Sequence, residues 1–149
     1  MKNKWKGAPM DYEIKRNCDN VDWQAVSDLL KTVGMAHYPP DIHQKAFEAS
    51  YSVVFILDSG KLVGMGRAIS DGAYQAAFYD FAVSPDYQGA GLGRIILSTI
   101  LADVPNCHVI LYAAIGKEGY YETQGFRKMK TGMARFLNAE AMAKKGFTE

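Results

Sequence analysis

Cysteine is scarce in this chain: only Cys18 and Cys107 occur among 149 residues, and no C-x-x-C spacing joins them. Two distant thiols favour the reduced cysteines of a cytosolic protein and argue against a disulfide framework. The three histidines, His37, His43 and His108, show no ligand spacing with one another or with the cysteines. We therefore expect no metal site.

An excess of charge of one sign is also missing. Seventeen Lys and Arg against sixteen Asp and Glu leave a formal charge of +1, which argues against nucleic acid or a membrane surface as a partner. No run approaches the ~18 apolar residues that a membrane span needs. We expect a cytoplasmic protein with a loose lead-in over residues 1–9 and a single domain over residues 10–149, because this length suits one core.

Apolar periodicity predicts a mixed α/β fold, in the order β-α-α-β-β-β-α-β-α-β-β. Asp19 or Asn20 is expected to cap the first helix, and Pro39 and Pro40 to keep the second helix from starting before Asp41. The strand-helix-strand crossover should be parallel, which places a ligand at the carboxyl ends of its strands. The predicted elements are strands at 12–16, 51–57, 62–69, 75–83, 109–114 (buried on both faces), near 126 and at 133–136, and helices at 21–33, 41–50, 92–102 and 119–124.

Three glycines separate a predicted strand from a predicted helix in the stretch SPDYQGAGLGR, residues 84–94. A helix N-terminus presents unpaired N–H groups, and glycine permits close approach and positive φ, so the stretch is typical of an anion site. The alternative is a helix preceded by a flexible turn. The stretch does not match a P-loop. It does not match the dinucleotide fingerprint G-x-G-x-x-G either, because Arg94 stands where the last glycine of that fingerprint belongs.

The spacing Gln88-x-x-Gly91-x-Gly93, preceded by DFAVSPDY, resembles the acyl-CoA-binding motif of the GNAT superfamily of N-acetyltransferases. A second segment, GYYETQGF at 119–126, is similar to the Phe-Tyr-x-x-x-Gly-Phe signature of that family. The resemblance implies the GNAT-like acyl-CoA N-acyltransferase fold and acetyl-CoA as cosubstrate. Residues 62–93 are also similar to the plastid serotonin N-acetyltransferases of plants and their bacterial relatives.

The resemblance implies a role for the glycine-rich turn and for the strand before it. Main-chain groups of the strand end would pair with the pantetheine arm, and amides of the turn would hold the CoA pyrophosphate. Arg94 would add charge there, or it is a solvated residue of the first helical turn. The cofactor-binding residues predicted in this way are Phe81, Ala82, Val83, Gln88, Gly89, Ala90, Gly91, Leu92, Gly93 and Arg94.

Two residues are predicted to be catalytic. Tyr121 aligns with the general-acid tyrosine of the family, although it is also compatible with a core aromatic. Asp80 is the preferred base, because a carboxylate in the apolar strand FYDFAV must be paired, coordinated or functional, and the plant enzymes carry an aspartate there. We expect Asp80 to face away from Tyr79 and Phe81; a structural ion pair with Arg67 is the alternative.

The resulting hypothesis is an acetyl-CoA-dependent N-acetyltransferase that acts directly on a primary amine, either a small arylalkylamine or a protein lysine or N-terminus. The alternative is an acyl-CoA-binding sensor or interaction module without turnover. His37, beside Tyr38-Pro39-Pro40, would line the acceptor pocket or belong to a surface loop. An exposed edge strand at 133–136 would suit a homodimer.

Overall fold

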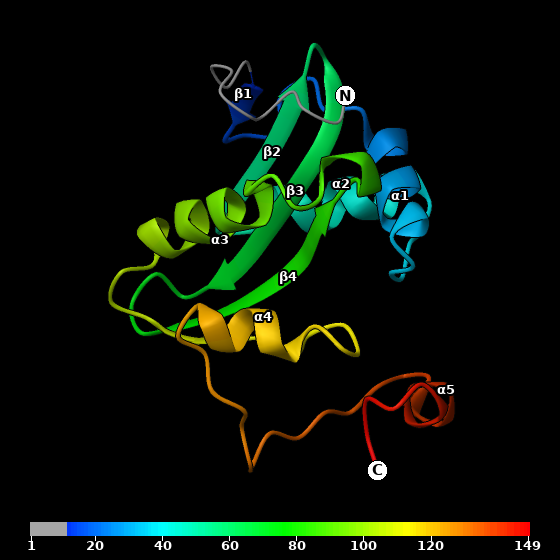
Figure 1. The fold of residues 1–149 in the computed structure, drawn as a ribbon, viewed down its shortest axis with the longest axis vertical. Helices are drawn as coiled ribbons and strands as arrows, with labels where there is room; N and C mark the ends of the chain where they lie inside the picture. The colour runs from blue at the N-terminus through cyan, green and yellow to red at the C-terminus, as the bar shows by residue number, and fades with distance from the viewer. Residues whose placement is uncertain (1–11) are drawn as a thin grey trace. The chain divides into compact units, whose positions relative to one another are not determined.

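The computed structural model of the chain describes residues 12–149, and Figure 1 draws its elements. The predicted lead-in over residues 1–9 lies outside the described residues. The chain divides into two compact units, the first ending at Leu111 and the second spanning Tyr112–Glu149. The single domain expected over residues 10–149 stays a prediction.

A five-stranded sheet forms the centre of the first unit, and its strands follow one another in chain order. The pairs from β1 to β4 are antiparallel, whereas β4 and β5 are parallel. The predicted parallel crossover is therefore confirmed, and β2, β3 and β4 form an antiparallel meander. The strands are β1 (Tyr12–Lys15), β2 (Ser52–Asp58), β3 (Lys61–Ser70), β4 (Gln75–Val83) and β5 (His108–Ile110).

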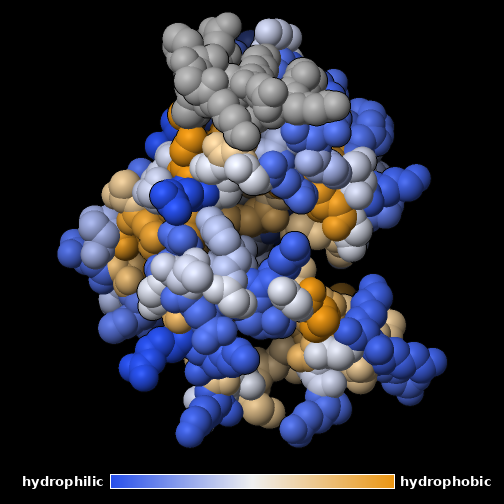
Figure 2. All heavy atoms as spheres, viewed as in Figure 1, coloured by the Kyte–Doolittle hydropathy of each residue, from blue (hydrophilic) through white to orange (hydrophobic). Residues whose placement is uncertain are grey.

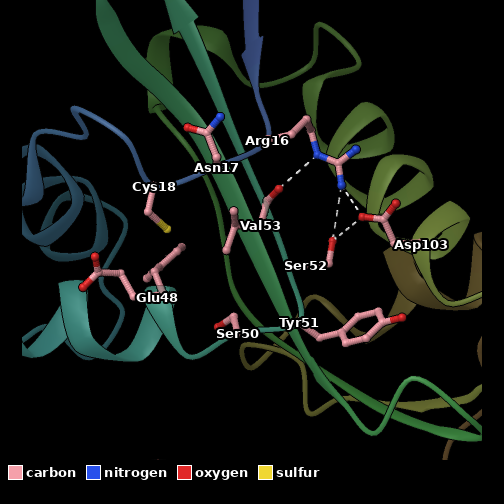
Figure 3. Close-up of a pocket in the computed structure, with 10 residues that line it drawn as sticks. Arg16, Asn17, Cys18, Glu48, Ser50, Tyr51, Ser52, Val53 and Asp103 are labelled. Atoms are coloured by element: carbon pink, nitrogen blue, oxygen red, sulfur yellow. Dashed lines mark hydrogen bonds and ion pairs between the residues drawn. The ribbon is translucent and has the colours of Figure 1, made fainter.

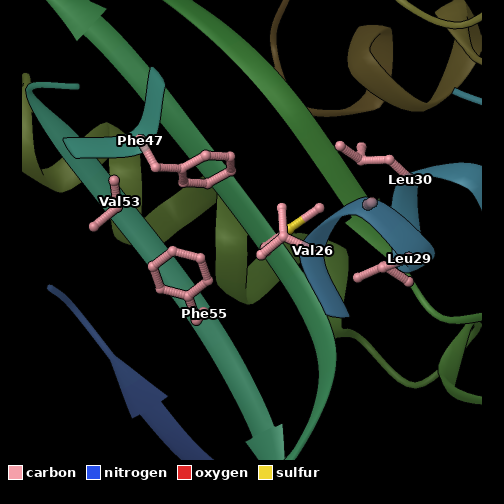
Figure 4. Packing of buried hydrophobic residues seen from close by; sticks show 8 residues of the cluster. Val26, Leu29, Leu30, Phe47, Val53 and Phe55 are labelled. Carbon is pink, nitrogen blue, oxygen red and sulfur yellow. The ribbon is translucent and has the colours of Figure 1, made fainter. Parts of the chain in front are cut away.

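The helices α1 (Trp23–Thr32) and α2 (Pro40–Glu48) pack on one face of the sheet, where they bury the cluster shown in Figure 4. The apolar residues of α1 recur at helical spacing, so one side of the helix faces the strands. Burying such side chains is the main stabilising contribution to this unit. The cluster consists of Val26, Leu29, Leu30, Phe47, Val53, Phe55, Met65 and Ala82.

The helix α3 (Leu92–Asp103) packs on the opposite face. Side chains alternate along β3, so Met65 points to the cluster under α1 and α2, whereas Gly64 and Gly66 face Ile96 of α3. A Cβ at Gly66 would lie 2.7 Å from Ile96 Cγ2 and 2.8 Å from the ring of Phe81. The glycines therefore let α3 approach the sheet closely.

Both predictions for the starts of α1 and α2 were wrong. Asp22 caps α1, because its Oδ1 accepts a hydrogen bond from Ala25 N at 3.1 Å, whereas Asn20 adopts a left-handed conformation before the helix. The helix α2 begins at Pro40. Proline is tolerated there because the N–H that it lacks would have no partner in the first helical turn.

The second unit contains α4 (Glu118–Thr123) and α5 (Ala139–Lys144), and no strand forms among residues 112–149. The strands predicted near 126 and at 133–136 were wrong. Their apolar residues are few and alternate with Lys128, Lys130 and Gly132, so an extended segment there has little apolar surface to bury. Met133 and Leu137 are almost fully exposed instead.

The strand β5 is also shorter than predicted. Its pairing with β4 ends at Ala77 and Ile110, and Ile110 is half exposed, so the apolar run 109–114 is not a strand buried on both faces. A strand persists only as far as a neighbour pairs with its backbone. The missed α5 follows Asn138 and consists mainly of residues with high helix propensity, which is the signal that the sequence offered.

The surface mixes polar and apolar residues. On the face shown in Figure 2, hydrophobic residues gather in small groups between hydrophilic ones. Among residues 12–149, no helix combines the length and hydropathy needed to cross a bilayer.

Candidate active site

The glycine-rich turn takes the conformation that its sequence predicts. Gly89 and Gly91 have φ of +79° and +87°, and Gly91 is the N-cap of α3. No side chain caps this helix and no acidic residue stands in its first turn. A Cβ at either glycine would meet nothing within 4 Å, so glycine is required here for its backbone conformation. The first N–H groups of α3 therefore form a site suited to an anion.

The two ends of this turn are fixed to the rest of the unit. Gln88 Nε2 donates to the carbonyl of Val83 at 3.0 Å, and Ser84 N donates to the carbonyl of Val63 at 2.8 Å. At the other end Leu92 is buried, while the side chain of Arg94 is exposed. The turn is held by its flanking residues, while its own backbone stays accessible.

Tyr87 anchors the turn from the 3₁₀ segment Pro85–Tyr87. It is buried, and its hydroxyl donates to Asp58 Oδ2 at 2.6 Å. Burial, followed by the hydrogen bond to Asp58, raises the pKa of Tyr87 to about 12. The sequence gives no sign of this role for Asp58, because nothing in it distinguishes a buried aspartate at a strand end from an exposed one.

The carboxyl end of β4 extends beyond its neighbour β5. The parallel pairing covers only Gln75–Ala77, so the edge of β4 from residue 78 onward has no β5 backbone beside it. The predicted pantetheine-binding residues Phe81, Ala82 and Val83 lie in this stretch, directly before the turn. A strand edge that extends beyond its neighbour is the kind of element to which an extended ligand chain can add as a further strand.

A β-bulge interrupts β4 at Asp80. Arg67 pairs with Tyr79 and Met65 with Ala82, so Gly66 lies opposite two residues, Asp80 and Phe81. Asp80 has φ of +57°, the left-handed region that aspartate tolerates better than most residues.

The bulge places Tyr79 and Asp80 on the same side of the sheet. Arg67 contacts both, with its guanidinium 5.4 Å from the Tyr79 ring centre, whereas Phe81 points to the α3 face and stacks on Phe78. The expected alternation of Asp80 with Tyr79 was therefore wrong, because alternation stops at a bulge.

Arg67 and Asp80 form the ion pair that the sequence left open. Arg67 Nε lies 2.7 Å from Asp80 Oδ2, and the two side chains are 14% and 20% exposed. Arg67 Nη1 also donates to Ser50 Oγ at 3.3 Å, and its guanidinium lies 5.5 Å from the Phe47 ring centre. Among residues 12–149, no hydrogen bond reaches the other oxygen, Asp80 Oδ1. The pair fixes the carboxylate and leaves one of its oxygens available.

Tyr121 lies in α4 of the second unit. Its half-buried ring packs at 5.3 Å from Tyr120 and 5.8 Å from Phe126, between ring centres. Burial, followed by the neighbouring Tyr120, raises the pKa of Tyr121. Gly125, with φ of +90°, follows the end of the helix. Because its pKa is raised, Tyr121 keeps its proton at neutral pH.

A separate polar cavity of about 410 Å³ lies beyond the end of β1 (Figure 3). Arg16 forms an ion pair with Asp103 there and donates to the carbonyl of Val53 at 3.0 Å, which ties β1 to β2 and α3. Burial, followed by Glu48, raises the pKa of the Cys18 thiol in the cavity wall. The cavity contains none of the predicted site residues, and its thiol is a weak nucleophile at neutral pH.

Among the residues described, no three His, Cys, Asp or Glu side chains are placed to hold a metal ion. The absence of a metal cofactor stays a prediction.

Comparison with known proteins supports the predicted fold. A sequence model of the GNAT acetyltransferase domain matches residues 23–138. A probable acetyltransferase of methicillin-resistant Staphylococcus aureus superposes with a TM-score of 0.74 at 24% identity, covering 85% of this chain and 99% of that one. For glucosamine-6-phosphate N-acetyltransferase of Arabidopsis thaliana the TM-score is 0.64 at 14% identity, with coverages of 85% and 99%. The GNAT-like mixed α/β fold class is confirmed.

Curated proteins are also similar in sequence, and two of them illustrate the likeness. Chloroplastic serotonin N-acetyltransferase 2 of Oryza sativa subsp. japonica is 30% identical over an alignment of 127 positions that covers 80% of this chain and 63% of the rice protein. The uncharacterized N-acetyltransferase ycf52 of Porphyra purpurea is 30% identical over 82% of this chain and 67% of that protein. The chain thus spans about two-thirds of the length of these relatives. It belongs to the GNAT acetyltransferase family, whose members use acetyl-CoA as cosubstrate.

Proposed function

We propose that this chain is an acetyl-CoA-dependent N-acetyltransferase that transfers the acetyl group directly to a primary amine. The observation that carries the proposal is the uncapped N-terminus of α3, which follows the open end of β4 through two glycines in left-handed conformations. This arrangement combines an anion site with a strand end that extends beyond its neighbour β5. Membership of the family supplies the ligand that needs both features.

The residues present fit CoA. Amides of the turn from Gly89 to Arg94 would hold its pyrophosphate, since a helix N-terminus favours negative charge and no acidic residue stands in the first turn of α3. The exposed Arg94 would add positive charge from the first turn of α3. The β4 residues Phe81, Ala82 and Val83 would offer backbone groups to the pantetheine arm.

Two side chains would move protons during transfer. The acceptor nitrogen forms a bond to the acetyl carbon, the carbon–sulfur bond breaks, and one proton must leave the nitrogen while one reaches the sulfur. Asp80 would take the proton from nitrogen through Oδ1, while Arg67 holds Oδ2. Tyr121 would give its proton to the sulfur, which its raised pKa permits at neutral and mildly alkaline pH.

We further propose a small arylalkylamine as the acceptor. The name of the rice relative, a serotonin N-acetyltransferase, supports this class. The test is thiol release from acetyl-CoA with serotonin-like amines, polyamines, aminosugars and lysine peptides. Turnover with arylalkylamines alone supports the acceptor, and turnover with another class of amine corrects it while preserving the reaction.

The non-catalytic sensor is the alternative outcome of the same measurement. If no amine in the panel releases thiol while acetyl-CoA raises the melting temperature, the turn binds CoA and the transferase proposal fails. If acetyl-CoA neither raises the melting temperature nor is consumed, the assignment of the turn fails as well.

A further inference from the structure

Both backbone polar groups of Tyr38, in the segment between α1 and α2, are held by buried side chains. His43 Nε2, from α2, accepts a hydrogen bond from Tyr38 N at 2.9 Å. Ser27 Oγ, from α1, donates to the carbonyl of Tyr38 at 2.7 Å. His43 and Ser27 are only 3% and 6% exposed, while Tyr38 is 54% exposed. The backbone of an exposed residue is therefore clamped from inside the protein.

The hydrogen bond from Tyr38 requires neutral histidine. An Nε2 that accepts from a backbone N–H carries no proton, whereas both ring nitrogens donate in the charged form. Burial has the largest effect on His43. It lowers the pKa of the ring and so favours the neutral form. Among its charged neighbours, Asp80 favours the charged form, and Arg67 and His37 oppose it.

The clamp lies beside the candidate base. His43 interacts electrostatically with Asp80 and Arg67, and the Tyr38 ring packs on the His43 ring with 5.6 Å between their centres. Asp80 points to the sheet face that α1 and α2 cover, since its partner Arg67 contacts Phe47 of α2. The exposed Tyr38 ring and the carboxylate are thus on the same side of the sheet, and His43 interacts with both.

We propose that His43 is a positioning residue, which in its neutral form holds Tyr38 as an aromatic wall of the acceptor-amine site beside Asp80. The inference rests on the proposed acetyl transfer. An exposed aromatic ring on the same side of the sheet as a carboxylate suits an amine that carries an aromatic group, because the ring can contact its apolar part while the carboxylate faces its nitrogen. Protonation of His43 releases the Tyr38 amide and with it the wall.

The test measures kcat and KM for the acceptor between about pH 5.5 and 8.5, the range in which histidine titrates. His43→Phe removes the acceptor atom, and we expect the KM for the amine to rise about tenfold while the KM for acetyl-CoA stays unchanged. His43→Gln keeps an accepting oxygen and does not titrate, so we expect it to restore the KM. Tyr38→Ala should raise the KM for arylalkylamines as His43→Phe does.

The pH dependence separates positioning from a merely structural role. The KM for the acceptor also depends on pH because the amine itself titrates. Dividing the KM of the wild type by the KM of His43→Gln at each pH removes this shared effect. We expect the ratio to rise as the pH falls. Ser27→Ala loosens the other half of the clamp without a titrating group, so its profile should keep the shape of the wild type. His108→Gln, at an exposed histidine of β5, should change neither the KM nor the profile.

Two results would overturn the proposal: a ratio that does not change with pH, or an unchanged acceptor KM in Tyr38→Ala. Hydrogen exchange of the Tyr38 amide tests the clamp without turnover, and its protection should disappear in His43→Phe and persist in His43→Gln. If the Tyr38 amide is protected in the wild type but no amine is acetylated, the proposed function fails, and with it the role of Tyr38 in the acceptor site. An unprotected amide in an active wild type contradicts the clamp alone.

Discussion

Arg67 is held by several groups at once: the Asp80 carboxylate, the Ser50 hydroxyl and the rings of Phe47 and Tyr79. These contacts fix the guanidinium, which in turn fixes Oδ2 of Asp80. The sequence marked Asp80 because a carboxylate stood in an apolar strand, and that reasoning also found its partner. The bulge was not predictable, since an aspartate at positive φ has no pattern that distinguishes it from an ordinary strand residue.

Asp80→Asn should lower kcat by about 10²-fold or more, because it removes a general base. Asparagine tolerates positive φ as aspartate does, so the bulge should persist. Arg67→Lys is the matched control, since it keeps a cation beside Asp80 and should retain most of the activity. Equal losses in both variants, measured as initial rates of thiol release, would show that the ion pair acts only through structure.

Tyr121→Phe should lower kcat by about 10²-fold or more and leave the affinity for acetyl-CoA unchanged, because only the proton donor is lost. Isothermal titration and initial rates measure the two quantities. Tyr120→Phe is the control on the same helix. Because the pKa of Tyr121 is raised, the wild type should show no alkaline loss of activity near the ordinary tyrosine pKa of about 10. A full rate in Tyr121→Phe would reduce this side chain to a packing role.

At the scale of elements, the turn before α3 combines a required conformation with empty space around it. The glycine spacing was visible in the sequence, and so was the helix that follows. The open edge of β4 was not visible, because the apolar run after 108 predicts a longer β5 than the sheet contains. Where a strand stops depends on its pairing partner, which local residue patterns do not determine.

Gly91→Ala should destabilise the fold by about 1 kcal/mol, the cost of a Cβ at positive φ, and weaken acetyl-CoA binding. Gly34→Ala is a matched control: Gly34 ends α1 at φ of +80°, and a Cβ there also meets nothing within 4 Å. Both variants should lose similar stability in urea unfolding, while only Gly91→Ala loses affinity. Unchanged affinity in Gly91→Ala would argue against the turn as the pyrophosphate site.

For the whole molecule, the sequence predicted the fold class and the family, because two motifs stood in register on the expected elements. It did not predict the end of the chain correctly, where short apolar runs carry no long-range information about partners. The homodimer and the cytoplasmic location stay predictions. The edge strand expected at 133–136 is absent, so a dimer would have to use other surfaces of the chain.

Folding stability should decrease on acidification through His43. The pKa of His43 is lowered in the folded protein, so below its ordinary value of 6.5 the unfolded chain binds a proton that the folded protein resists. This contribution to stability is present above 6.5 and is lost as the pH falls below it. Urea unfolding at a series of pH values should show a shallower acid loss for His43→Gln than for the wild type. Parallel curves would mean that His43 titrates alike in both states.

The bulge in β4 arises from one extra residue, and it contains Asp80, the proposed base. Deleting Asp80 would leave β3 and β4 in uninterrupted register. Phe81 would still face α3, and Ala82 would still lie in the core. The sheet would lose little, and the site would lose its proposed base. A one-residue deletion at this point should thus convert a transferase into a folded protein that only binds the thioester.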